Sequence, residues 1–228
     1  MNLTSNRLIA ASGLCAVAAG AIFIGVQINH PPADVEHVVT SEMFIREGAK
    51  ATMAVLALAG LTGLFVRTHR RLGLAGLIGY VMISVGYLAM FAVQSIVGFV
   101  LPTVAKTRPA DVPDFFDGAM GKTPTGDIGT MGVLFAVMGM GYAIGGLLFG
   151  IALYRTRLVS RWASALFAAS TIAVLALKFL PEFFSRPFAI PTGIALIGLG
   201  LSQWREPRHP ADASVAPVPA RVAVAAGR

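Results

Sequence analysis

Residues 51–101 read ATMAVLALAGLTGLFV, then RTHRR, then LGLAGLIGYVMISVGYLAMFAVQSIVGFVL. Two long apolar runs therefore flank a short turn that is rich in arginine. A helix needs about 20 largely apolar residues to cross a hydrocarbon core that is ~30 Å thick. Basic residues gather in the loops that stay on the cytoplasmic side of a membrane. The stretch predicts two transmembrane helices joined by a tight cytoplasmic turn.

The same pattern recurs along the whole chain. Six apolar stretches qualify as spans, at residues 8–28, 50–66, 72–101, 128–154, 162–180 and 188–204. The first is longer than the apolar core of a signal peptide, which has about 7–15 residues, so we expect it to be retained. The third is longer than a perpendicular span needs, so we expect it to tilt or to project outward. The predicted fold class is all-α, a polytopic transmembrane bundle with six spans.

The second span is short, and its helix is expected to begin before the apolar run. Thr40 and Ser41 are good N-cap residues. Charged residues follow them at helical spacing: Glu42, Arg46, Glu47 and Lys50. We therefore expect the helix to begin near Thr40, with its charged first turns in or above the outer headgroups of the membrane.

Composition excludes an ordinary soluble globule. Over 228 residues the chain is 56% hydrophobic and 13% charged, with a mean hydropathy of +0.74, whereas soluble domains carry roughly 25% charged residues. The net charge of +7 does not come from a basic patch with interleaved aromatic residues, so a nucleic-acid partner is not expected. The expected partner is the lipid bilayer. The only cysteine, Cys15, lies in the first apolar run, so no intrachain disulfide can form.

The distribution of charge predicts the orientation. Residues 1–7, 67–71, 155–161 and 205–228 hold eleven of the 18 Lys and Arg residues and only two acids, while the alternate segments hold seven basic and nine acidic residues. The positive-inside rule then places both termini in the cytoplasm. We expect a membrane domain at residues 1–204, and a disordered cytoplasmic tail at residues 205–228. The expected location is the cell membrane, as a multi-pass protein.

Ionisable residues avoid the middle of all six stretches. Such residues mark proton relays and ion paths when they lie within a membrane, so their absence argues against a proton-driven pump or an ion channel. All four histidines lie in loops or the tail, which disfavours a haem held by two histidines. His30, Asp34 and His37 share the first external loop, but their spacing matches no metal motif. We expect neither a metal nor a cofactor.

Charged residues instead gather at the outer interface. This group comprises Glu42, Arg46, Glu47, Lys50, Asp127, Lys178 and Glu182. Pairs three or four positions apart on a helix can form ion pairs, so one interpretation is a set of solvated ion pairs at helix ends. The other interpretation is the mouth of an outward-facing cavity, which binds a polar head or supplies an acid.

Two further patterns concern the faces of the spans. The third span carries a stripe at steps of three and four residues, formed by Tyr80, Ser84, Tyr87, Phe91 and Gln94. Such a stripe faces the bundle, where it either forms hydrogen bonds between helices or lines a cavity. The fourth span contains two small-xxx-small patterns, Gly141 to Gly145 and Gly146 to Gly150, which allow close packing within the bundle or between the protomers of a homo-oligomer.

Two segments carry a resemblance to a known group of proteins. One is Pro32-Ala33-Asp34 followed by Ser41-Glu42-Met43-Phe44-Ile45-Arg46, and the other is Gly145-Gly146-Leu147-Leu148-Phe149-Gly150-Ile151-Ala152-Leu153-Tyr154-Arg155 leading into Arg161-Trp162-Ala163. Their layout resembles uncharacterised bacterial six-span membrane proteins that are grouped as domains of unknown function. The resemblance implies a location in the bacterial cytoplasmic membrane and implies no activity.

Two functional hypotheses follow from these patterns. The first is a binding or accessory protein of transport or resistance whose outward-facing cavity accepts a small hydrophobic or amphipathic molecule. Its candidate ligand-binding residues are Arg46, Lys50, Tyr80, Ser84, Tyr87, Gln94 and Lys178. The alternative is a membrane-embedded cyclase or isomerase that acts on a lipid-like substrate, with Glu42, Glu47, Asp127 or Glu182 as general acid. The first is preferred because no acid is placed deep within a span.

Overall fold

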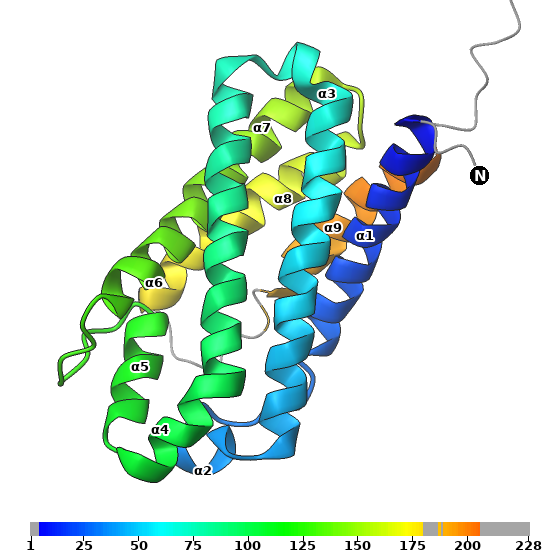
Figure 1. The fold of residues 1–228 in the computed structure, drawn as a ribbon. Coiled ribbons are helices and arrows are strands. Elements are labelled where there is room, and N and C mark those ends of the chain that lie inside the picture. The colour runs from blue at the N-terminus through cyan, green and yellow to red at the C-terminus, as the bar shows by residue number, and fades with distance from the viewer. Residues whose placement is uncertain (1–4, 180–186, 188, 206–228) are drawn as a thin grey trace, which may run out of the picture.

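The computed structural model describes residues 5–179, 187 and 189–205, and within these ranges it contains helices and no strand (Figure 1). The α-helices are α1 (Ser5–Gly25), α2 (Val35–Val38), α3 (Ser41–Ser95), α4 (Leu101–Thr107), α5 (Asp111–Ala119), α6 (Met131–Met140), α7 (Gly146–Thr156), α8 (Arg161–Ala173) and α9 (Ala189–Arg205). Two π-helical turns, η1 (Ile96–Val100) and η2 (Gly141–Gly145), and one 3-10 helix, η3 (Val174–Phe179), continue them. The all-α class predicted from the sequence is confirmed.

Three helical segments of the described chain are long and apolar enough to cross a membrane. They are Arg7–Gly25, Ser41–Thr107 and Met131–Thr156, and Arg161–Ala176 is a shorter apolar helix. The predicted tail beyond Arg205 and the end of the fifth predicted span lie outside the described residues.

Helix α3 consists of two arms that run side by side in opposite directions (Figure 1). Gly73 separates them, because its φ of 66° and ψ of −177° are not helical, and glycine adopts positive φ without steric cost. The first arm begins where the sequence predicts, since the Thr40 side chain accepts a hydrogen bond from the backbone N–H of Met43 at 3.2 Å. The Tyr80 and Thr62 hydroxyls, 2.9 Å apart, join the two arms by a hydrogen bond.

Small residues set the spacing between the helices. Gly141 and Gly145 in η2 lie against the backbone of the second arm of α3, near Met82 and Gly86, and the neighbouring Gly146 meets Thr171 of α8. Gly150 meets Ala168 of the same helix. The glycine run of the fourth predicted span therefore packs within the chain, and a homo-oligomer through this run stays a prediction.

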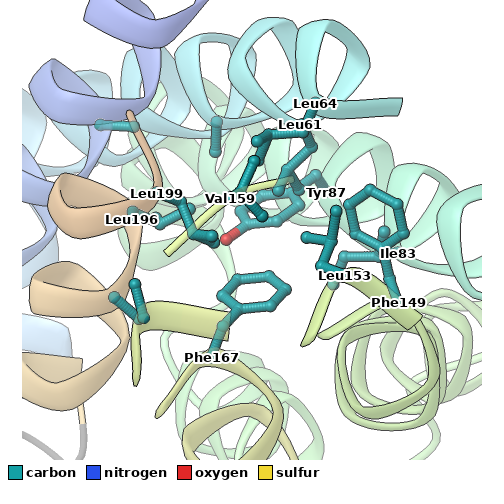
Figure 2. Packing of buried hydrophobic residues seen from close by; sticks show 14 of the residues in the cluster. Leu61, Leu64, Ile83, Tyr87, Phe149, Leu153, Val159, Phe167, Leu196 and Leu199 are labelled. Carbon is teal, nitrogen blue, oxygen red and sulfur yellow. The ribbon is translucent and has the colours of Figure 1, made fainter. Parts of the chain in front are cut away.

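Two hydrophobic clusters fill the bundle. The larger one lies between α1, both arms of α3, α7, α8 and α9, and Figure 2 shows its centre, where the Tyr87 ring lies among Phe167, Leu196 and Leu199. The smaller one joins α2, the end of α3, η1, α4, α5 and α6. In this cluster the rings of Phe115 and Phe135 meet edge to face at 5.1 Å. The segment between the third and fourth predicted spans, residues 102–127, therefore contains most of α4 and all of α5, and α5 folds back onto α6.

The two ends of the bundle differ in charge. One end holds the Gly73 turn, the turn between α7 and α8, the start of α1 and the end of α9, and its described charged residues are Arg7, Arg67, Arg70, Arg71, Arg155, Arg157, Arg161 and Arg205. The opposite end, which holds α2, α4 and α5, carries the described acids, Asp34, Glu36, Glu42, Glu47, Asp111, Asp114, Asp117 and Asp127. We refer to these as the arginine end and the acidic end.

The packing of η2 predicts opposite effects for two neighbouring glycines. A Cβ at Gly141 would lie 2.8 Å from the Met82 carbonyl oxygen and 2.9 Å from the Gly86 Cα atom, whereas a Cβ at Gly139 meets nothing within 4 Å. We expect Gly141→Ala to lower the free energy of unfolding by about 1–3 kcal/mol through overpacking. Gly139→Ala should raise it by up to about 1 kcal/mol, because alanine favours the helix. Equal unfolding curves for the two variants in detergent would contradict this packing.

Candidate functional site

Two adjoining cavities lie at the acidic end. The larger, here the chamber, has a volume of about 710 Å³, within the range of roughly 300–1,000 Å³ that small-molecule sites occupy. Its walls include Phe23, Met90, Phe135, Met138, Tyr142 and Val174. The smaller, here the niche, has a volume of about 230 Å³ and includes Gln27, His30, Glu47, Lys50, Gln94 and Phe116. Gln27, Ala119, Met120 and Met138 line both cavities.

The charged centre of the niche comes from the first turns of α3. Glu47 is 2% exposed, and its Oε1 accepts a hydrogen bond from Lys50 Nζ at 2.6 Å. His30 Nε2 lies 3.6 Å from the same oxygen. Burial of an ion pair costs several kcal/mol of hydration for each ion, which only close contact and further hydrogen bonds offset. The three residues therefore form one electrostatic unit.

One oxygen of this unit is left without a partner. Glu47 Oε2 is buried and accepts no hydrogen bond from protein atoms. A buried acceptor that is left unsatisfied costs about 1–3 kcal/mol, and more when it is charged. The residue also lines the niche. Glu47 Oε2 can therefore accept a hydrogen bond from a donor group of a ligand in the niche.

His30 is oriented by the chain that precedes α3. Its Nδ1 lies 2.7 Å from the Pro31 carbonyl oxygen, and because a carbonyl only accepts, Nδ1 carries the proton in this bond. The other ring nitrogen, Nε2, is thereby turned toward Glu47. Asn29 adopts a φ of 51° just before the histidine, which turns the chain after α1 back toward α3.

Arg46 and Glu42 hold this loop in place. Arg46 donates to Glu42 Oε1 through Nε at 3.0 Å and through Nη2 at 2.8 Å. Its Nη1 donates to the backbone oxygens of Val26 and Ile28 at 3.1 and 2.9 Å. The Glu42 side chain is 58% exposed, and neither residue lines a cavity. The pair ties the end of α1 to α3 and so positions His30.

The polar stripe of the third predicted span divides between two environments. Tyr80 stacks on Phe65 with ring centroids 4.2 Å apart and bonds Thr62, and the Ser84 hydroxyl donates to the Tyr80 carbonyl oxygen at 2.7 Å. Tyr87 lies in the core (Figure 2). None of these three lines either cavity, whereas Gln94 lines the niche. The stripe therefore serves mainly to pack helices together.

The remaining candidates lie away from the niche. Asp127 is exposed, and its Oδ1 accepts a hydrogen bond from the backbone N–H of Gly129 at 2.7 Å. Lys178 belongs to η3, and its side chain is not among those described. Glu182 lies outside the described residues. The structure therefore brings together Glu47, Lys50 and Gln94 from the predicted set.

Helix α5 and the loop after it cover both cavities. Phe116 lines the niche, while Gly118 to Lys122 line the chamber. Asp114 anchors the loop by accepting hydrogen bonds from the Thr125 backbone N–H at 2.7 Å and from its hydroxyl at 2.9 Å. The bond from the Thr125 hydroxyl, with backbone bonds from Gly126 and Thr125, lowers the pKa of Asp114 below its ordinary value of 3.8. This anchor is complete above that ordinary value and weakens as pH falls through the lowered pKa.

The first external loop does not assemble a metal site in the described part of the chain. Asp34 caps α2 and accepts from the backbone N–H of His37 at 2.8 Å and from its Nδ1 at 2.7 Å. His30 faces Glu47 instead. Among the described residues, no three His, Cys, Asp or Glu side chains lie close enough to hold a metal ion.

No protein-family model, curated protein or solved structure matches this chain. The resemblance to bacterial six-span proteins therefore stays a prediction, and function has to be inferred from the cavities themselves. Two of their residues, Gln27 and Phe116, were not among the predicted ligand-binding residues, and His30 was considered only as a metal ligand. A polar amide at the end of an apolar run was the available signal for Gln27.

The ion pair in the niche can be tested by a double-mutant cycle. Lys50→Met removes the ammonium group that neutralises the buried Glu47 carboxylate, so we expect the free energy of unfolding to fall by about 3 kcal/mol. Adding Glu47→Gln should recover part of this loss, with a coupling energy of about 1–3 kcal/mol. Denaturant unfolding in detergent measures each variant. Glu42→Gln is the matched control on the exposed pair and should change stability by less than about 0.5 kcal/mol. Additive effects of the two niche substitutions would refute the coupling.

Proposed function

We propose that this protein is a six-span membrane protein that binds a small amphipathic molecule in the chamber and the niche. One observation carries this proposal: an apolar cavity of about 710 Å³ adjoins a polar cavity that holds a buried, partly unsatisfied carboxylate. Ligand sites are typically apolar with a few convergent polar groups that fix orientation. The chamber suits a hydrocarbon body, and the niche suits a polar head.

The outer surface supports the membrane location. The second arm of α3 exposes large apolar side chains along its length, namely Leu74, Leu77, Ile78, Val81, Val85 and Leu88. Large apolar side chains that are exposed at helical spacing along one arm suit contact with lipid. Six spans arise if each arm of α3 crosses once, and if α1, the α6–α7 rod, the α8–η3 rod and α9 each cross once.

The two ends of the bundle support the proposed orientation. The arginine end suits the cytoplasmic side under the positive-inside rule, and both described ends of the chain, at α1 and α9, lie there. The acidic end then faces outward, together with the chamber and the niche. The protein is accordingly proposed to reside in the cell membrane and to act there as an accessory, transport or resistance component.

A membrane-embedded enzyme is the second candidate, and Glu47 is the observation that favours it. It is buried and lines a cavity, whereas Glu42 and Asp127 are exposed. However, contact with Lys50 at 2.6 Å stabilises the ionised carboxylate, which suits a base or a binding group better than a general acid. Binding is therefore the preferred proposal.

Filling the chamber tests the binding proposal. Gly139 lines the chamber, and a Cβ there meets open space, so Gly139→Phe should place a ring inside it. We expect mass spectrometry of the purified wild-type protein to detect a copurifying amphipathic molecule, and we expect Gly139→Phe to lose most of it. Gly48→Phe is the matched control, because Gly48 also meets open space but lines neither cavity. Equal retention by both variants would place the molecule elsewhere.

Cysteine labelling tests the proposed orientation. In a Cys15→Ser background, a single cysteine is placed at exposed Thr123, at the acidic end, or at exposed His69, at the arginine end. A membrane-impermeant maleimide added to intact cells should modify Thr123→Cys and spare His69→Cys. Permeabilised cells should show labelling of both. Labelling of His69→Cys alone in intact cells would reverse the orientation, and labelling of both would indicate an even number of spans between them, which contradicts the single crossing proposed for the second arm of α3.

A further inference from the structure

If the protein binds an amphipathic molecule as proposed, the polar groups of the niche determine which head group that molecule carries. Glu47 Oε2 is a buried acceptor without a protein donor. Lys50 Nζ carries three N–H groups, and one of them is directed to Glu47 Oε1. The niche therefore presents an unused acceptor close to a donor, and both line the same small cavity.

The charges of the niche disfavour a charged head. The titratable side chains lining it are His30, Glu47 and Lys50, and its two glutamines, Gln27 and Gln94, are neutral. An anionic head would meet the Glu47 carboxylate, which is more deeply buried than the ammonium group that balances it. A cationic head would meet Lys50. Placing a charged head group next to a side chain of the same charge weakens binding.

A hydroxyl satisfies both groups at once. It can donate a hydrogen bond to Glu47 Oε2 and accept one from Lys50 Nζ, because a hydroxyl is both donor and acceptor. It adds no charge to a pair that is already balanced. The unsatisfied Oε2 then gains the partner that the protein does not supply.

We propose that the niche and the chamber select a long-chain alcohol, with its hydroxyl between Glu47 and Lys50 and its hydrocarbon chain in the chamber. The chamber provides an apolar wall of methionine and aromatic side chains for that chain. Methionine is unbranched and adapts to flexible apolar ligands. A fatty acid and a fatty amine of the same length share the chain and differ only in the charge of the head.

Photolabelling of the full-length protein in detergent tests this selection. The probes are hexadecan-1-ol, hexadecanoic acid and hexadecylamine, each with the same diazirine on the chain, and labelled chamber peptides are quantified by mass spectrometry. The wild-type protein should be labelled by the alcohol at least about tenfold more than by the acid or the amine, the ratio that ~1.4 kcal/mol produces.

Two variants make the charge argument specific. Glu47→Gln removes the negative charge and should shift labelling toward the acid, whereas Lys50→Met removes the positive charge and should shift it toward the amine. If either variant fails to purify as a folded protein, the alcohol-to-acid and alcohol-to-amine labelling ratios of the wild-type protein test the selection by themselves.

The outcomes separate this inference from the proposed function. The alcohol selection is overturned if the acid or the amine labels the wild-type protein as strongly as the alcohol does. It is also overturned if both variants keep the wild-type labelling ratios. Either result still leaves a chamber that binds a hydrocarbon chain. Labelling that does not exceed that of Gly139→Phe for any probe overturns the binding function and the selection together.

Discussion

Close approach of helix backbones at glycine determines the shape of this bundle. At η2 and α7, four glycines in three helical turns lie against the second arm of α3 and against α8, where Met82, Gly86, Ala168 and Thr171 leave no space for a side chain. Contact of this kind relies on dispersion forces and close packing between the helix backbones. The contact ends at Gly141. Two residues earlier, Gly139 meets nothing within 4 Å, and the chamber begins.

The chamber is therefore a consequence of where the tight packing stops. Toward the arginine end, small residues draw α1, α7, α8 and α9 together around a filled core. Toward the acidic end, the walls change to Phe135, Met138 and Met90, which keep the elements apart. Helix α5 then closes over the space, anchored by Phe115 on one face and by Asp114 through its loop. One end of the bundle is tightly packed, and the other encloses the two cavities.

An ion pair gives the smaller cavity beside that volume a polar centre. Glu47 and Lys50 are one turn apart on α3, so their pairing is local, but their burial depends on the loop that carries His30 and on Gln94 and Phe116 from distant parts of the chain. Arg46 contributes without lining the cavity, since its guanidinium holds the end of α1 through two backbone oxygens. An ion pair that would add little stability on a solvated helix is thus buried, where it forms the polar centre of an otherwise apolar pair of cavities.

The sequence alone determined the helical class, the start of α3 at Thr40 and the gathering of the described acids at one end of the bundle, because hydropathy, capping and charge are properties of neighbouring residues. It also placed Glu47, Lys50 and Gln94 among the candidates. Only the tertiary structure decided that Tyr80 and Tyr87 pack between helices, that the glycine run packs within the chain, and that His30 meets Glu47 rather than Asp34. These outcomes depend on how closely helices approach and how each rotates, which residue periodicity does not specify.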